Sequence, residues 1–238
     1  MELCTAGDEG SWIAAAASLL GEALDEAKAA GRGSLELCLA GGSTPSPIYR
    51  AFAALPLRGD RIGLWLGDER DVAASHPSRN DAMVAAAFAT CAWEPAPRLH
   101  AWAARTEGAD SPLAAGIDPW LEEACAAYAS ELAEAMGAEP AFDLVFLGLG
   151  EDGHAASLFP GQGILAERVR LAAPSLAPVE PWRRMSLTYP AFARARRLAV
   201  LVRGPGKAAV VARLAAGDPA LPASSLGGER RLILYCPA

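Results

Sequence analysis

Short apolar segments alternate with helical segments along most of this chain, and this alternation constrains its fold more than any other feature. Near-continuous apolar runs bounded by glycine, proline or charged residues predict strands at residues 35–40, 62–66, 142–149, 185–189, 198–202 and 232–235. Because these runs are apolar throughout rather than at every second position, we expect both faces of the sheet to be covered.

Helical periodicity separates the predicted strands. Apolar residues at helical spacing predict helices over 12–30, 46–54, 81–91, 119–136 and 207–216. Asp118 followed by Pro119 is typical of a helix start, with the aspartate as N-cap and the proline at the first helical position. The alternation favours an α/β fold with a doubly wound, mostly parallel sheet and helices on both faces. The Pro- and Gly-containing stretches at 94–97, 108–116 and 217–222 are predicted surface loops, so we expect a single domain over 1–238.

Composition excludes several classes of protein. The 238 residues are 52% hydrophobic and carry a net charge of −7, so we expect a full core and no dominant attraction to nucleic acid or to an anionic membrane. The start of the chain lacks a basic segment followed by an apolar one, and no apolar run approaches the ~20 residues of a membrane span, which predicts a cytoplasmic location. The five cysteines are scattered without a CxxC pair, which predicts reduced, mostly buried thiols and no zinc site.

The loop at residues 40–45 is the first candidate for chemistry. Ligands of parallel α/β sheets bind beyond the carboxyl ends of strands, and this loop leaves one strand and opens the next helix. Gly41 and Gly42 allow backbone N–H groups to approach an anion, while Ser43 and Thr44 add hydroxyl donors. The loop therefore predicts a phosphate cradle, with an ordinary capped turn as the alternative. It lacks the GxxxxGK[ST] spacing of a P-loop.

A charged segment follows the predicted strand at 62–66. Asp68, Glu69 and Arg70 stand at its carboxyl end, where Asp68 and Arg70 are placed to contact sugar hydroxyls and an anion, or to form only a solvated turn. Asn80 is the only asparagine in the chain and joins these candidates, with a helix N-cap before Asp81 as its alternative role.

A glycine-rich segment, GLGEDGH, covers residues 148–154 after the predicted strand at 142–149. It spells GxGxxG, but Pro160-Gly161 leaves too little room for the crossover helix of a dinucleotide site, and no acidic residue stands at a strand end near 167–171. Gly150 and His154 are instead predicted site residues, because an imidazole ordinarily titrates near neutrality and suits a general base. Asp152 is close enough to orient His154 or to tie the N–H groups of the loop.

Cationic residues complete the candidates. Arg184 belongs to the segment Arg-Met-Ser-Leu-Thr at 184–188, and Lys207 follows Gly-Pro-Gly. Lys207 begins a predicted helix, where a positive charge opposes the helix dipole, so its position suggests a bound anion. A solvated helix start is the alternative.

Taken together, these segments resemble the 6-phosphogluconolactonase family. The resemblance rests on GGSTP at 41–45, Asp-Glu-Arg at 68–70 with Asn80, GLGEDGHAASLFPG at 148–161, RMSLT at 184–188 and GPGK at 204–207. The related glucosamine-6-phosphate deaminases typically carry Asp-Glu-Tyr at the second segment and Asn-Glu-Pro after the histidine. The Asp-Glu-Arg and Ser-Leu-Phe-Pro of this chain favour the lactonase branch.

The resemblance implies hydrolysis of 6-phospho-D-glucono-1,5-lactone to 6-phosphogluconate, with no metal or other cofactor. His154 would activate the attacking water, oriented by Asp152 or a backbone carbonyl. Arg70 would stabilise the developing oxyanion or hold the phosphate, which Ser43, Thr44, Arg184 and Lys207 would bind. A sugar-phosphate isomerase or deaminase and a non-catalytic sugar-phosphate sensor are the alternatives, and the sequence leaves the oligomeric state open.

Overall fold

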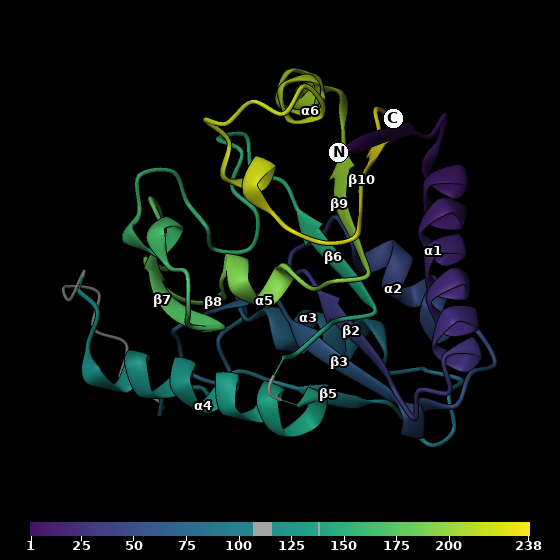
Figure 1. The fold of residues 1–238 in the computed structure, drawn as a ribbon, viewed down its shortest axis with the longest axis horizontal. Helices are drawn as coiled ribbons and strands as arrows, with labels where there is room; N and C mark the ends of the chain where they lie inside the picture. The colour runs from purple at the N-terminus through teal and green to yellow at the C-terminus, as the bar shows by residue number, and fades with distance from the viewer. Residues whose placement is uncertain (107–115, 138) are drawn as a thin grey trace.

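A parallel sheet forms the centre of the molecule (Figure 1). The structure is a computed structural model and describes residues 1–106, 116–137 and 139–238. Its strands are β1 (Glu2–Thr5), β2 (Leu35–Leu39), β3 (Ile62–Leu66), β5 (Arg98–His100), β6 (Leu144–Gly148), β9 (Arg197–Arg203) and β10 (Arg230–Cys236). They lie in the order β1, β10, β9, β6, β2, β3, β5, and every neighbouring pair is parallel. The predicted α/β class with a mostly parallel sheet is confirmed.

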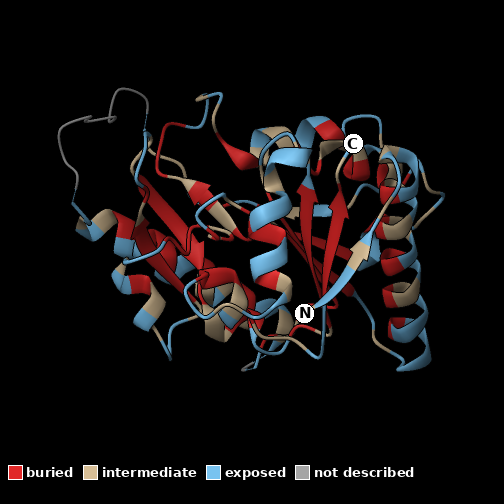
Figure 2. Cartoon of the chain, turned by 90° about the horizontal axis from the view of Figure 1, so that it is seen from above, coloured by how far each residue is buried: buried red, intermediate tan, exposed pale blue. Residues whose placement is uncertain are grey.

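Helices pack around this sheet. They are α1 (Glu9–Ala29), α2 (Ser46–Ala53), α3 (Asn80–Ala87), α4 (Pro119–Met136), α5 (Tyr189–Phe192) and α6 (Ala208–Ala215). Helix α1 packs on α2, and α2 packs on α3, whereas α4 lies apart from this group (Figure 1). The inner strands β2, β3, β6 and β9 are buried along most of their length, whereas the edge strand β1 is largely exposed (Figure 2). The long helices bury one stripe of side chains. None of the described helices is long and apolar enough to cross a membrane.

The predicted helix start at Asp118 is confirmed. Its side chain accepts a hydrogen bond from the backbone N–H of Leu121 at 2.9 Å, and Pro119 is the first residue of α4. The predicted loop at 108–116 lies almost wholly outside the described residues. All five cysteines are free thiols, and Cys38, Cys125 and Cys236 are buried.

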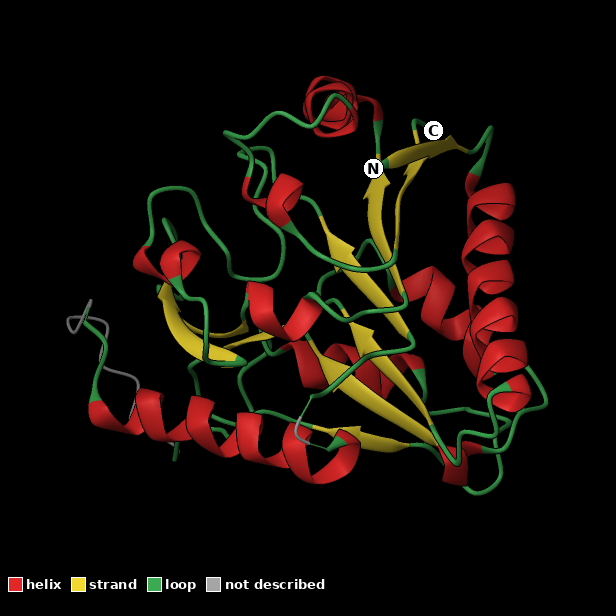
Figure 3. Cartoon of the chain, viewed as in Figure 1, coloured by secondary structure: helices red, strands yellow, loops and turns green. Residues whose placement is uncertain are grey.

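A second, smaller sheet corrects the predicted topology (Figure 3). It contains β4 (Asp68–Arg70), β7 (Ala172–Leu176) and β8 (Arg183–Leu187), and all its pairs are antiparallel. Of the strand expected in the parallel sheet at 185–189, residues 185–187 lie here instead, and Tyr189 begins α5. Residues 68–70, expected in a loop, form a strand. Gly67 joins the two sheets, because its N–H donates to Leu39 O at 3.0 Å while its carbonyl accepts from Leu187 N at 2.9 Å.

The parallel topology brings distant loops together. Strands β2, β3, β6 and β9 point the same way, so their carboxyl ends lie at one edge of the sheet. The segments that leave this edge are the glycine-rich loop after β2, the Asp-Glu-Arg strand after β3, the histidine loop after β6 and Gly-Pro-Gly-Lys after β9.

Candidate active site

A cavity of about 340 Å³ opens at this edge. Residues from five separate chain segments line it: the loop after β2, strand β4, the start of α3, the histidine loop, and β8 with the loop that precedes it. Of the twelve predicted site residues, nine line the cavity: Gly41, Gly42, Thr44, Asp68, Arg70, Asn80, Gly150, His154 and Arg184.

The other three predicted site residues do not line the cavity. Ser43 is exposed in the loop after β2. Asp152 contacts the imidazole of His154 through its carboxylate. Lys207 lies close to the histidine loop, since its Nζ donates to Leu149 O at 3.2 Å and stands 4.0 Å from a carboxylate oxygen of Glu151. Residues 205–207 form a short 3-10 helix, so α6 begins one residue after Lys207.

His154 is held by a carboxylate and by an aromatic ring. Its Nδ1 lies 2.5 Å from Asp152 Oδ1, and its backbone N–H donates to the same oxygen at 3.1 Å. Asp152 therefore both orients the imidazole ring and binds a backbone N–H group of the loop. Burial acts to raise the pKa of Asp152, but the two bonds from His154 outweigh it and hold the pKa below its ordinary value. The ring of Phe159 lies 4.5 Å from the imidazole ring, centre to centre.

At Gly41 and Gly150, neighbouring side chains lie too close to leave room for a Cβ atom. A Cβ on Gly150 would lie 2.1 Å from His154 Nδ1, so a larger residue would displace the imidazole. A Cβ on Gly41 would lie 1.8 Å from Asn80 Oδ1. The absence of side chains at these positions thus shapes the cavity wall, and not only the backbone conformation.

Two guanidinium groups lie side by side in the cavity wall. Arg70 and Arg184 are opposite each other on the antiparallel pair of β4 and β8. Among the described residues neither Nε atom has a hydrogen-bond partner, although both atoms are buried. Burial, followed by repulsion from Arg70, lowers the pKa of Arg184 to about 10. Two cations that line one cavity and are not paired with each other favour binding of an anion.

Asp68 and Asn80 also form part of the wall. Asp68 Oδ2 accepts from Ser157 Oγ at 2.6 Å, and Asn80 Nδ2 donates to the backbone oxygen of Asp68 at 2.8 Å. Asn80 Oδ1 is buried without a hydrogen-bond partner among the described residues. The N-cap alternative for Asn80 was wrong, because α3 begins at Asn80 itself and Arg79 precedes it.

Ser157 and Glu69 contact the site but are not among the predicted site residues. Ser157 is fully buried and ties the histidine loop to Asp68, but no local sequence pattern marks this contact. Glu69 is also fully buried, whereas its two charged neighbours suggested a solvated segment. Only the alternation of a strand would have indicated that Glu69 points away from Asp68 and Arg70.

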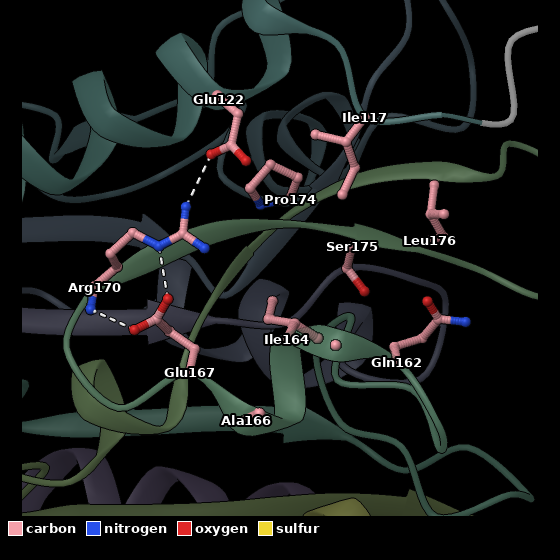
Figure 4. Close-up of a pocket in the computed structure, with 11 residues that line it drawn as sticks. Ile117, Glu122, Gln162, Ile164, Ala166, Glu167, Arg170, Pro174, Ser175 and Leu176 are labelled. Atoms are coloured by element: carbon pink, nitrogen blue, oxygen red, sulfur yellow. Dashed lines mark hydrogen bonds and ion pairs between the residues drawn. The ribbon is translucent and has the colours of Figure 1, made fainter.

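A second hollow of about 340 Å³, shown in Figure 4, has different chemistry. Its only cation among the lining residues is Arg170, which forms ion pairs with Glu122 at 2.9 Å and Glu167 at 2.6 Å. The pairs neutralise Arg170 and leave an excess negative charge, so this hollow does not favour a phosphate. Within the described ranges, no group of three or more His, Cys, Asp or Glu side chains is arranged to hold a metal ion.

Comparison with known proteins gives the family. The model described as glucosamine-6-phosphate isomerases/6-phosphogluconolactonase matches residues 7–234. The chain belongs to this family. A 6-phosphogluconolactonase from Streptomyces coelicolor is 36% identical over 228 residues, which cover 92% of this chain and 84% of that protein. One from Synechocystis sp. is 37% identical over 180 residues, 74% of this chain and 69% of that protein.

Solved structures share this fold. The 6-phosphogluconolactonase from Leishmania guyanensis matches with a TM-score of 0.81 at 23% identity, covering 99% of this chain and 96% of that one. A monomeric glucosamine-6-phosphate deaminase matches with a TM-score of 0.75 at 20% identity, over 99% and 97% of the two chains. At these identities the likeness shows the fold alone.

Proposed function

We propose that this chain hydrolyses the ester bond of 6-phospho-D-glucono-1,5-lactone to give 6-phosphogluconate in the oxidative pentose phosphate pathway. The observation that carries the proposal is a pair of guanidinium groups, those of half-buried Arg70 and buried Arg184, in the same cavity as the imidazole of His154. The pair suits the phosphate and the developing oxyanion, and the imidazole suits activation of water. The relatives at 36% and 37% identity, both named 6-phosphogluconolactonase, support the lactone as substrate.

The contact between His154 and Asp152 defines the proton transfer. An ionised carboxylate only accepts hydrogen bonds, so the 2.5 Å contact of Asp152 Oδ1 assigns the ring proton of His154 to Nδ1 and leaves Nε2 as the base. Nε2 takes a proton from water, and the resulting hydroxide adds to the lactone carbonyl. When the ring C–O bond breaks, the imidazolium returns a proton to the leaving oxygen.

The remaining site residues bind and orient the substrate. Arg70 stabilises the oxyanion or shares the phosphate with Arg184, and Thr44 and Ser43 of the loop after β2 add hydroxyl donors. Asp68 and Asn80 contact sugar hydroxyls or brace the wall of the cavity. Lys207 attracts the phosphate from its position beside the histidine loop.

A direct assay tests the proposal. Purified protein is added to freshly made 6-phosphogluconolactone, and acid release is compared with the uncatalysed rate. The account predicts hydrolysis well above that background and no ammonia release from glucosamine 6-phosphate. Ammonia release without lactone hydrolysis would identify a deaminase, and binding of both sugars without turnover would identify a sensor.

We also propose where the enzyme works and what it needs. The enzyme would work as a single phosphosugar lactonase domain over residues 1–238, in the cytoplasm, without cofactor or nucleic acid. An activated ester needs only a positioned base and charge stabilisation, both of which this chain's own residues provide.

A further inference from the structure

Glu69 stands in β4 between two residues that line the cavity. Its side chain is fully buried and does not line the cavity, although both its neighbours do. Its carboxylate accepts three hydrogen bonds from backbone N–H groups: Asn80 at 2.7 Å, Arg70 at 2.8 Å and Asp81 at 2.9 Å. One side chain thus joins strand β4 to the first turn of α3.

The bonds of Glu69 reach the backbone of two cavity residues. Arg70 and Asn80 each carry a buried side-chain atom without a partner among the described residues, Nε and Oδ1 respectively. These two side chains come from different elements, and the Glu69 carboxylate holds the N–H group of each. A shift of this carboxylate would therefore move both cavity groups.

Burial makes the ionised form of Glu69 unfavourable. Burial raises its pKa to about 7, although three backbone N–H groups and Arg79 oppose this effect. The nearest cation, Arg79 Nη2, is 3.9 Å from Oε2 and is itself bound to Asp81 and to a backbone oxygen. Unfavourable groups that a fold retains are expected at functional sites.

We infer that Glu69 is a positioning residue, which fixes Arg70 and Asn80 relative to each other so that the guanidinium group meets an anionic group and the amide oxygen meets a hydroxyl donor of one bound ligand. This inference rests on the proposed function for the identity of the substrate. A displacement of about 1 Å in groups that hold a substrate is enough to lower turnover by roughly a hundredfold.

Glu69→Gln is the first test. Glutamine keeps the shape but replaces one oxygen by an NH2 donor. This donor opposes the N–H of Asp81 if it replaces Oε2, or the N–H groups of Arg70 and Asn80 if it replaces Oε1, so in either orientation it pushes the first turn of α3 away from β4. The matched control is Asp143→Asn, because Asp143 is also buried, has a pKa raised by burial, and accepts from a backbone N–H, that of Glu36 at 2.9 Å. Asp143 precedes β6 and so lies at the opposite end of the sheet from the cavity.

The two variants should separate stability from positioning. We expect kcat/KM for the lactone to fall roughly tenfold or more in Glu69→Gln and by less than about twofold in Asp143→Asn, with thermal unfolding recorded for both. Glu69→Asp, which keeps the charge and shortens its reach, should show the same loss if the glutamine variant does not fold. Wild-type kcat/KM in the folded Glu69 variants would overturn the inference.

A double-mutant cycle with Arg70→Gln supplies a readout that a merely structural role would not move. If Glu69 acts through Arg70, the roughly tenfold loss should shrink to less than about threefold when Arg70 is already glutamine. An equal loss in both backgrounds would contradict a positioning role.

Binding of inorganic phosphate separates this inference from the proposed function. If the wild-type protein does not hydrolyse the lactone, the proposed function fails, but Glu69→Gln should still weaken phosphate binding measured by calorimetry by roughly tenfold, and Asp143→Asn should not. Equal phosphate affinity in wild type and Glu69→Gln would overturn the inference. A wild-type protein that neither hydrolyses the lactone nor binds phosphate would contradict both.

Discussion

At the scale of single residues, the cavity is built for a ligand rather than for stability. Arg70 and Arg184 place two cations together, and the buried Nε atom of each has no partner among the described residues. A buried charge that lacks full compensation destabilises a fold, and a bound anion restores the balance. Substitutions in this pair should therefore affect binding and stability in opposite directions.

Arg184→Met tests that opposition. Methionine fills similar space without charge, so we expect the free energy of unfolding to rise by about 1–3 kcal/mol, because the cation whose pKa burial lowers to about 10 is removed. The KM for the lactone should rise roughly tenfold or more. Urea unfolding and steady-state kinetics measure the two effects, and a variant that is destabilised with an unchanged KM would refute the assignment of Arg184.

Glu69 gives a pH dependence of stability whose sign is fixed. With an ordinary pKa of 4.5 and a folded-state pKa of about 7, the folded protein retains a proton that the unfolded chain releases. The resulting stability is present below pH 4.5 and is lost as the pH rises through 7. At about 1.4 kcal/mol per unit, the stability of wild type relative to Glu69→Gln should fall by about 3 kcal/mol between pH 4.5 and 7.5. Urea unfolding of both proteins across this range measures the difference in their free energies of unfolding. A difference that stays the same at every pH would contradict the prediction.

At the scale of elements, local signals predicted well and long-range pairing did not. The bounds of α4 at Pro119–Met136 and of β3 at Ile62–Leu66 agree with the sequence predictions, because capping residues and apolar runs act over a few positions. Strand β4 was not predicted, because its partner β8 lies more than a hundred residues away along the chain. The short edge strands β1 and β5 also lack a clear apolar run.

For the site as well, features that follow from the strand pattern were predicted and contacts between distant segments were not. Nine of the predicted residues meet at the cavity because the carboxyl ends of parallel strands share one edge, a property of topology that the sequence pattern implies. The buried roles of Glu69 and Ser157 depend on contacts between segments, Glu69 with Asn80 and Ser157 with Asp68. No local pattern reports such contacts.

Tyr128→Phe tests how α4 is attached to the main sheet. The buried hydroxyl of Tyr128 accepts from Leu66 N at 2.8 Å and lies 3.1 Å from His100 O, so it joins α4 to β3 and β5. Phenylalanine keeps the ring that stacks on Trp102 but leaves these backbone groups unpaired. We expect the free energy of unfolding to fall by about 1–3 kcal/mol in urea titrations. A change of less than about 0.5 kcal/mol would show that the hydroxyl is not needed.

At the scale of the whole molecule, an acidic protein concentrates positive charge in one cavity. The chain carries a net charge of −7, yet Arg70 and Arg184 line the hollow that contains His154, and Lys207 lies beside its histidine loop. This arrangement directs a small phosphorylated anion to the imidazole without attracting polyanions to the rest of the surface. The fold, by closing five separate segments around one imidazole, makes that ring the centre of the proposed reaction.

The most direct measurement compares lactone hydrolysis by wild type and His154→Ala, each corrected for spontaneous hydrolysis. The account predicts that kcat falls by about a hundredfold or more in the variant, because water loses its base, while binding of inorganic phosphate is retained. A folded His154→Ala protein with near wild-type kcat would contradict the account.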